Sequence, residues 1–297
     1  MRYVHVSTDF YSYNKTETGK KLPFLEFPIH ARKPENIGYV SNRLAMPENR
    51  FYMPFKNLME AVSRHGMTFS PGIFENNNRS QQGFIGSEMV ALDFDNGLEM
   101  QEALDIPNFY GVTPNCIYET FSSTPKLRKF RMIWILDHFV TNAKIYRFLM
   151  SALQCIFDSK ADRQALEVSR LFYGSNKGIW YFNEAPVLSV PMVTTAVMAK
   201  IENSYGKNLF KKKQQEFFES QGILWEDNRP KIGITENDRE FGVETHIYYI
   251  CNSTRNSLEG LTRNYRTAEF IVGNQLTKTP FLTKSKLQFY GQIRKCG

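Results

Sequence analysis

Residues 87–95, which read SEMVALDFD, decide the fold, because they describe a mostly apolar β-strand that ends on two acids. Side chains two positions apart along a strand point to the same face of its sheet. The strand is therefore expected to place Val90, Leu92 and Phe94 on one face, and Ala91, Asp93 and Asp95 on the other. Both carboxylates then point the same way at the end of the strand.

The segments after this strand predict the remainder of an α+β unit. In order, they are a short helix at 96–105, strands at 115–122 and 129–136, a long amphipathic helix that follows Thr141 as its N-cap, and a fourth strand, SRLFYG, at 169–174. This order is β-α-β-β-α-β, which is typical of ferredoxin-like or RRM-like units. We expect an antiparallel sheet with the strand order 4-1-3-2. The ends of strands one and two then meet the starts of strands three and four at one edge.

The chain on either side of this unit suggests two further parts. Residues 1–86 predict an N-terminal α/β module, whose clearest helix is FKNLMEAVSRHG at 55–66. Together with the RRM-like unit at about 87–204, this module would form a catalytic domain spanning 1–204. The composition shifts near residue 200, and 205–297 is expected to be a smaller, mostly helical accessory domain.

Composition narrows the class of protein. The 297 residues carry a formal net charge of +7, which favours polyanionic partners such as nucleic acid. The sequence contains no apolar stretch near the roughly 18 residues that a membrane span needs, and its start does not resemble a signal peptide. Its four cysteines are far apart and form no CxxC pair, which argues against a zinc site or a disulfide framework. We therefore expect a cytoplasmic protein with no membrane partner.

Asp93 and Asp95 are the strongest candidates for chemistry. Two like charges held on one strand face cost free energy unless a cation neutralises them. Carboxylate oxygens suit Mg²⁺ or Mn²⁺, and two such ions about 3.5–4 Å apart can activate a hydroxyl and stabilise a leaving group. The alternative is a solvated strand end with two incidental acids. Alanine at both positions is expected to abolish the chemistry and leave the fold intact, because both acids are expected at an exposed strand end.

Other chemically active side chains are expected at the same edge of the sheet. The second strand ends on a cluster of hydroxyls that includes Ser122 and Ser123, and the third strand opens with Lys129 and Arg131. Hydroxyls and cations of this kind can bind phosphate oxygens. An ordinary turn and a solvated rim are the alternatives for these two groups. Arg131 lies within an apolar strand pattern, where an arginine usually has a partner.

The segment before the fourth strand adds a third acid and another cation. Asp162 is expected near Asp93, because strand four is expected beside strand one, and Glu167 is a competing candidate. Arg170 begins strand four and is a further candidate for binding phosphate. The loop 174–178, GSNKG, is basic and could also contact phosphate, although such loops are usually plain turns.

Three segments of the chain resemble the motifs of a known superfamily. They are ALDFDNG at 91–97, YETFSSTPKLRKFRMIWIL at 118–136 and ADRQALEVSRLFYG at 161–174. These resemble the three motifs of the archaeo-eukaryotic primase (AEP) superfamily, and more closely the primase-polymerase domains of phage, plasmid and mobile-element replication proteins. The resemblance covers roughly residues 70–185.

The resemblance implies a DNA-templated nucleotidyltransferase that makes or extends primers. It implies two divalent ions, Mg²⁺ or Mn²⁺, held by Asp93, Asp95 and Asp162, with single-stranded DNA as template and nucleoside triphosphates as substrates. The residues assigned to the triphosphate are Ser122, Ser123, Lys129, Arg131 and Arg170. A helicase partner would be a separate chain or a further segment, because the sequence contains no phosphate-binding GxxxxGK[ST] loop.

The sequence departs from the family at the second motif. That motif usually carries Ser-x-His, whereas Ser122-Ser123-Thr124 stands here. His138 is expected at the far end of the third strand and is no obvious substitute, so Lys129 and Arg131 would have to bind the phosphates instead.

Two alternatives stay open. One is a catalytically degenerate, primase-like protein that binds single-stranded nucleic acid or initiates replication without polymerising. The other is a haloacid dehalogenase-type phosphatase, whose first motif also reads apolar-DxD but follows a parallel strand.

Overall fold

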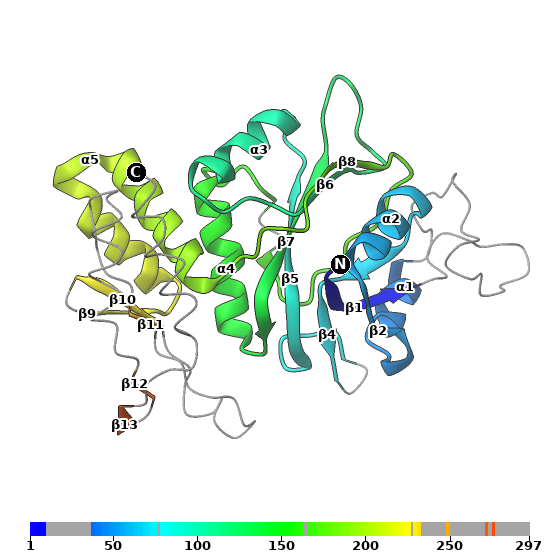
Figure 1. Ribbon diagram of the computed structural model, residues 1–297, viewed down its shortest axis with the longest axis horizontal. Helices are drawn as coiled ribbons and strands as arrows, with labels where there is room; N and C mark the ends of the chain where they lie inside the picture. The colour runs from blue at the N-terminus through cyan, green and yellow to red at the C-terminus, as the bar shows by residue number, and fades with distance from the viewer. Residues whose placement is uncertain are drawn as a thin grey trace, which may run out of the picture. The chain divides into compact units, whose positions relative to one another are not determined.

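A computed structural model of the chain divides into two compact units, Met1–Asn203 and Ser204–Gly297 (Figure 1). The structure describes residues 1–9, 37–75, 78–162, 166–226 and 228–232, together with the backbone of three short strands beyond them. Both helices and antiparallel sheets are present, so the fold is α+β. Within the described residues, no helix is long and apolar enough to cross a membrane.

A five-stranded antiparallel sheet forms the centre of the first unit. Its strands, in spatial order, are β4 (Gly72–Phe74), β5 (Phe84–Phe94), β7 (Phe130–Val140), β6 (Cys116–Glu119) and β8 (Ile179–Phe182). β5 pairs with β7, and β7 pairs with β6, as the sequence predicts for strands one, three and two. Figure 1 shows the long strands β5 and β7 side by side in the middle of the unit.

The prediction of a fourth strand at 169–174 is wrong. This segment forms a single bridge, in which Phe172 and Phe69 exchange backbone hydrogen bonds of 2.9 and 2.7 Å. The place beside β5 belongs to β4 instead. β4 is joined to β5 by a short connection, and closing a short loop costs less chain entropy than bringing back a distant segment.

Two helices connect the central strands, and both begin later than the sequence predicts. α3 (Met100–Phe109) starts only after a turn in which Gly97 adopts a φ of 80° and the Asn96 side chain accepts a hydrogen bond from Leu98 N. α4 (Ala143–Ile156) is capped by Asn142, not by Thr141. The Asn142 side chain accepts from two free amides of the first turn, at 2.8 and 3.1 Å.

The described residues of the N-terminal module form a second antiparallel sheet and three short helices. The strands are, in spatial order, β2 (Arg50–Pro54), β1 (Tyr3–Asp9) and β3 (Thr68–Ser70); the helices are α1 (Ile37–Arg43), the 3-10 helix η2 (Pro47–Asn49) and α2 (Phe55–His65). α2 confirms the predicted helix, and its apolar side chains, Leu58, Ala61 and Val62, are buried.

The module covers one face of the central sheet. Val4 and Val6 of β1, the apolar side chains of α2, and Ala91 and Tyr118 of the central sheet belong to one buried cluster. The face that carries Ala91 and Asp93, which the sequence suggested was open, is therefore covered. Asp93 is 6 % exposed as a result.

The last long helix, α5 (Val190–Ser220), departs from helical geometry at Gly206, where φ is 67° and ψ is −177°. A glycine tolerates this conformation without a steric penalty. In the second unit, two small antiparallel sheets follow: β9 (Leu224–Glu226), β10 (Arg229–Ile232) and β11 (Tyr248–Tyr249), and then β12 (Ile271–Val272) and β13 (Gln275–Leu276). The expected helix near 205–220 is present, and most of 233–297 lies outside the described residues.

Candidate active site

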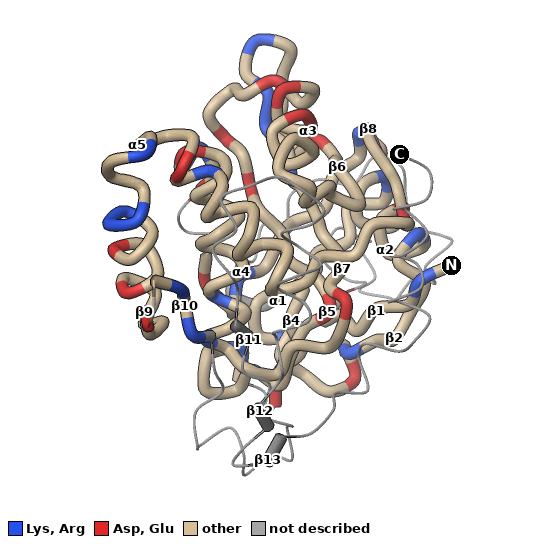
Figure 2. Tube along the Cα trace, turned by 60° about the vertical axis from the view of Figure 1, so that its left-hand side comes forward, with Lys and Arg blue, Asp and Glu red and all other residues tan. Residues whose placement is uncertain are grey.

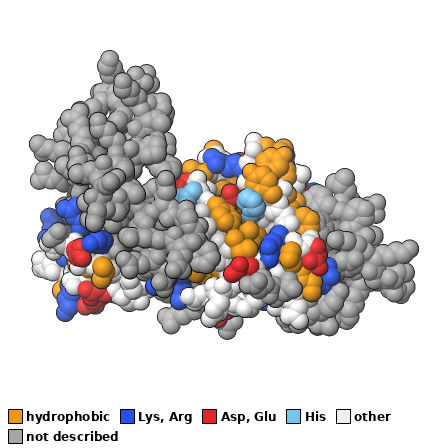
Figure 3. Space-filling view, turned by 90° about the horizontal axis from the view of Figure 1, so that it is seen from below, with side chains coloured by type: hydrophobic (Ala, Val, Ile, Leu, Met, Phe, Trp, Pro, Cys, Tyr) orange, Lys and Arg blue, Asp and Glu red, His pale blue; other side chains and the backbone are white. Residues whose placement is uncertain are grey.

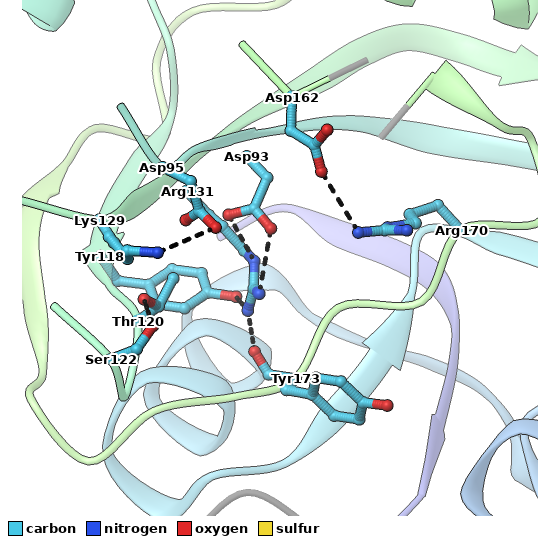
Figure 4. Close-up of polar contacts among 10 residues, drawn as sticks. All are labelled: Asp93, Asp95, Tyr118, Thr120, Ser122, Lys129, Arg131, Asp162, Arg170 and Tyr173. Carbon is cyan, nitrogen blue, oxygen red and sulfur yellow. Dashed lines mark hydrogen bonds and ion pairs between the residues drawn. The ribbon is translucent and has the colours of Figure 1, made fainter. Parts of the chain in front are cut away.

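Asp93 and Arg131 form a buried ion pair across the two central strands. They are register partners in β5 and β7. Arg131 Nε lies 3.2 Å from Asp93 Oδ1, and Nη2 donates to Oδ2 at 3.3 Å (Figure 4). Arg131 Nη1 also donates to the Tyr118 hydroxyl at 3.2 Å and to the Tyr173 carbonyl. The guanidinium group is therefore held from three sides.

The charge states of this group follow from its surroundings. Burial alone would lower the pKa of Arg131, but the Asp93 carboxylate and Tyr118 outweigh burial and raise it. Burial raises the pKa of Tyr118 to about 12, although Arg131 opposes this shift. At neutral pH Arg131 is therefore a permanent cation and Tyr118 a neutral donor and acceptor. The sequence did not identify Tyr118, whose only signal is its place opposite Arg131 in the β6–β7 register.

The buried position of Arg131 changes its predicted role. The residue is 7 % exposed, and its donors reach Asp93, Tyr118 and Tyr173. In this arrangement the guanidinium group is directed at protein groups, and little of the side chain is accessible. Arg131 is placed to orient Asp93, which is a positioning role.

Asp95 and Lys129 form a second ion pair, which is accessible to solvent. Asp95 follows the last residue of β5, and its Oδ2 lies 3.3 Å from Lys129 Nζ. The Asp95 side chain is 52 % exposed and that of Lys129 is 23 % exposed. Exposed pairs contribute about 0–1 kcal/mol. Both groups are therefore free to exchange partners at little cost.

Asp162 lies next to Asp93, as predicted, although through a loop and not through a fourth strand. Its amide donates to the Asp93 carbonyl at 2.8 Å. The preceding residue is anchored as well, because Gln154 of α4 donates to the Ala161 carbonyl at 2.9 Å. The Asp162 carboxylate lies 3.5 Å from Arg170 Nη2. The competing candidate, Glu167, is exposed, and its carbonyl accepts from the Arg170 amide.

Each acid predicted to hold metal is thus paired with a cation predicted to hold phosphate. Figure 4 shows Asp93 with Arg131 between the pair of Asp95 with Lys129 and the pair of Asp162 with Arg170. Among the described residues, no three His, Cys, Asp or Glu side chains form a group that could hold a metal ion. The three acids therefore do not form a ready-made cage in this arrangement.

Two of the acids still fit a divalent cation. Asp93 Oδ1 is buried and accepts no hydrogen bond, because its contact with Arg131 Nε is an ion pair without hydrogen-bond geometry. Figure 4 shows the Asp93 and Asp95 carboxylates pointing toward the same group of cations. Hard oxygen donors of this kind are what Mg²⁺ and Mn²⁺ prefer. A carboxylate oxygen without a hydrogen bond, next to the exposed Asp95, fits such an ion if the contact of Asp93 Oδ1 with Arg131 Nε is given up.

The predicted hydroxyl cluster divides into a structural and an accessible part. Ser123 is buried; its Oγ donates to the Glu119 carboxylate at 2.6 Å and accepts from the Lys129 amide at 3.1 Å. Ser122 is exposed, and its Oγ lies 3.3 Å from Thr120 Oγ1. Ser122 therefore remains available to a ligand, whereas the Ser123 hydroxyl is used to hold the turn.

The loop that joins β6 to β7 is basic. Figure 2 shows Lys and Arg positions at its tip and along one side. Arg128 of this loop forms an ion pair of 2.8 Å with Glu119. Burial alone would raise the pKa of Glu119, but the hydrogen bonds from Ser123 and Arg128 lower it. Lys129 thus belongs to a loop that is held in place by its own polar contacts.

The loop 174–178 is fixed against α2. Ser175 N donates to the Val62 carbonyl at 2.7 Å, and Gly178 N donates to the Ser63 carbonyl at 2.9 Å. The Lys177 side chain donates to the Ser123 carbonyl, which places its charge next to the β6–β7 loop. The sequence indicated a basic loop here but could not show that α2 anchors it.

His138 lies in a different part of the molecule, as expected. It is near the C-terminal end of β7, seven residues beyond Arg131, where Nδ1 lies 2.6 Å from Asp137 Oδ1. Aromatic side chains gather at this end of the sheet: the His5 ring lies 5.3 Å from Phe139 and 4.5 Å from Tyr52, which is 61 % exposed. Figure 3 shows a face on which hydrophobic side chains gather beside histidines.

The sheet argues against the haloacid dehalogenase alternative. That mechanism places its first Asp after a parallel strand of an α/β sheet. Here β5 is antiparallel to both of its neighbours, β4 and β7. The apolar-DxD motif therefore has a different structural setting in this chain.

No family model matches the chain, and no curated protein matches its sequence. A solved structure, the AEP domain of the primase-polymerase (PrimPol) of cyanophage S-2L, is similar in part, with a TM-score of 0.35 and 10% sequence identity. The similarity covers 50% of this chain and 80% of that one. At this TM-score the similarity gives no evidence about function.

Proposed function

We propose that the chain is a DNA-templated nucleotidyltransferase, a primase-polymerase that makes or extends primers. One observation carries this proposal: three acids and three cations meet in pairs where β5 ends and β7 begins, at separations of 3.2–3.5 Å. Nucleotidyl transfer needs carboxylates for divalent ions and cations for a triphosphate in one place. The RRM-like sequence pattern and the resemblance to AEP motifs agree with it, although the predicted fourth strand is replaced by β4.

The residues divide into three roles under this proposal. Asp93 and Asp95 would hold divalent ions, which when bound activate the attacking 3′-hydroxyl and stabilise the leaving pyrophosphate. Lys129 and Ser122 would bind the triphosphate, because both are accessible. Arg131 keeps the Asp93 carboxylate in one orientation. Asp162 is joined to Asp93 through the backbone and would complete the acidic side of the site.

The ion pairs suggest how such a site is filled. Lys129 neutralises Asp95 in the absence of ligands. When a triphosphate arrives, Lys129 gains a more highly charged partner, and Asp95 is released for a metal ion. The exchange costs little, since the pair is solvent-exposed. Nucleotide and metal should therefore bind cooperatively at this site.

The test is template-directed incorporation. Purified protein is given a homopolymeric single-stranded DNA template, labelled nucleoside triphosphates, and Mg²⁺ or Mn²⁺ in turn. We expect products only with the nucleotide complementary to the template, and none when a chelator is added. Incorporation of nucleotides that are not complementary to the template would contradict the proposal. The absence of products with every nucleotide and metal would contradict it as well. Separate reactions with ribo- and deoxyribonucleotides define the substrate class.

A second candidate is a protein that binds single-stranded nucleic acid without polymerising it. One observation favours it: all three acids are already neutralised by protein cations, and the described residues contain no three-ligand group for a metal. Template binding without any incorporation would select this candidate. A separate helicase chain remains a proposed partner under either function.

A further inference from the structure

Within the described residues, the hydrogen bonds of Arg79 go to neutral groups. Arg79 lies in the loop between β4 and β5. Its Nε donates to the Ser41 carbonyl at 3.4 Å, and its two other nitrogens donate to the Ser41 hydroxyl and the Ser169 carbonyl. Within the part of the chain that the structure describes, no carboxylate forms an ion pair with it. Glu167 acts on the charge of Arg79 without forming an ion pair with it, so this partly buried guanidinium group is compensated only in part.

A second arginine with unused hydrogen-bonding capacity lies beside it. Arg170 follows Ser169, whose carbonyl accepts from Arg79. Arg170 Nε is buried and has no hydrogen-bond partner among the residues that the structure describes, and the ion pair of Arg170 with Asp162 is a contact of 3.5 Å. Burial lowers the pKa of Arg79; Tyr173 and Glu167 oppose this shift, while the charge of Arg170 adds to it. The hydrogen bond to the Ser169 carbonyl thus joins Arg79 to the residue that precedes Arg170.

Arg170 and Lys129 lie on opposite sides of Asp93 (Figure 4). The polymerising reaction brings two phosphate-bearing substrates to the same carboxylates: a triphosphate and a nucleic-acid strand. Lys129, Lys177 and Ser122 are grouped around the β6–β7 loop on one side. Arg79 and Arg170 are not part of this group and are therefore available to bind the second substrate, the nucleic-acid strand.

We infer that Arg79 and Arg170 form a phosphate-binding site for the backbone of a nucleic-acid strand, distinct from the cations that would hold the triphosphate. The inference rests on the proposed function, because that function makes a strand the second substrate. A guanidinium fork matches two phosphate oxygens. A phosphodiester would supply a negative charge to Arg79, and would add to the single 3.5 Å contact that Arg170 makes with Asp162. The purely structural alternative is that Arg79 serves only to tie its loop to α1 and to Ser169.

The experiment compares two charge-removing variants. Arg79→Gln keeps hydrogen-bonding capacity and removes the charge; Arg147→Gln removes an exposed charge whose side chain contacts Gln81 of the same loop. The probe is a labelled oligodeoxythymidine, and its affinity is measured by fluorescence anisotropy over a range of salt concentrations. Metal and nucleotide are left out, so polymerisation plays no part. Thermal melts of each variant report whether the fold is retained.

We expect Arg79→Gln to bind the strand roughly tenfold more weakly, the usual effect of one charge-assisted hydrogen bond. The slope of log affinity against log salt should become shallower by about 0.7, as one phosphate contact is lost. Arg147→Gln should match the native chain, and Arg79→Lys should recover part of the affinity. If Arg79→Gln melts early, Arg170→Gln takes its place with the same expected loss.

Two results would overturn the inference. In the first, a folded Arg79→Gln variant binds the strand as Arg147→Gln does. In the second, strand affinity is unchanged while nucleotide affinity, measured in a separate titration with metal present, falls; this would assign the arginines to the triphosphate. The proposed function fails separately, through absent incorporation. If the native protein makes no product but Arg79→Gln still weakens strand binding, the phosphate-binding site would stand and the proposed polymerase function would not.

Discussion

Arg131 faces Asp93 across β5 and β7, with two nitrogen–oxygen contacts of 3.2 and 3.3 Å between side chains that are each 8 % exposed. This pair joins the chemistry to the stability of the fold, because the candidate metal ligand is also one partner of a buried ion pair. The sequence suggested that alanine at Asp93 and Asp95 would leave the fold intact. For Asp93 the premise of an exposed side chain is wrong, because Asp93 is buried against Arg131, and we expect its removal to leave a buried arginine without that carboxylate.

We predict that Arg131→Ala and Asp93→Ala each lower the free energy of unfolding by about 3–5 kcal/mol, the usual cost of removing one partner of a buried pair. Urea denaturation measures this loss. Lys129→Ala is the control, and it should stay within about 1 kcal/mol, because its pair is exposed. Equal, small losses in all three variants would show that the pair is not buried in solution.

Lys129→Gln should raise the nucleotide KM by roughly tenfold while leaving the melting temperature unchanged, since one charge-assisted contact to the triphosphate is removed. Steady-state incorporation at varied nucleotide concentration measures this. Lys126→Gln, at the exposed tip of the same loop, removes the same charge and should leave KM unchanged. Matching effects in both variants would point to general electrostatic attraction and not to a contact.

The pKa of His138 should lie above its ordinary value near 6.5, because its ring is hydrogen-bonded to the Asp137 carboxylate. A raised folded-state pKa means that the protonated pair stabilises the fold below about pH 6.5 and that this contribution disappears as pH rises through the raised value. Titration of the ring by NMR gives the pKa, and Asp137→Asn should lower it. A pKa at or below 6.5 in the native chain would contradict the contact.

Gly174→Ala should destabilise the fold by about 1–3 kcal/mol, as overpacking usually does. A Cβ at this position would lie 2.4 Å from the Gly66 carbonyl carbon and 2.5 Å from the Val62 oxygen, both of which are backbone atoms. Thermal or urea denaturation tests this, with the exposed neighbour Asn176→Ala as control. A Gly174→Ala variant as stable as the control would mean that loop 174–178 does not pack against α2 as described.

Much of the central sheet could be predicted from local pattern. The alternation in 87–95 and 129–136 gave both long strands, and their pairing places Asp93 opposite Arg131. The fourth strand could not be predicted in the same way. SRLFYG has strand-like composition, but its backbone pairs with Phe69 of β3 at one residue only, and that partner is about a hundred positions away in sequence.

The sequence predicted which residues lie together better than it predicted the contacts that they make. Asp93, Asp95, Lys129 and Arg131 do meet at one edge, because register brings them together. The burial of Asp93 depends on the N-terminal module, whose packing leaves no signal near the acids in the sequence. Arg79 was missed for a similar reason: it is isolated in a polar loop, and its neighbours Ser41 and Ser169 are distant along the chain.

The most direct test of a catalytic carboxylate pair uses Asp95, which can be changed without exposing a buried charge. Incorporation of nucleotides on single-stranded DNA, with Mg²⁺ or Mn²⁺, is compared among the native chain, Asp95→Asn and Glu99→Gln. Glu99 is an exposed carboxylate four residues away and is the matched control. We predict that Asp95→Asn loses incorporation at least a hundredfold, a typical effect of losing one electrostatic catalytic group, and still melts and binds template normally. Incorporation by Asp95→Asn at the level of Glu99→Gln would contradict a polymerase that depends on this pair of acids.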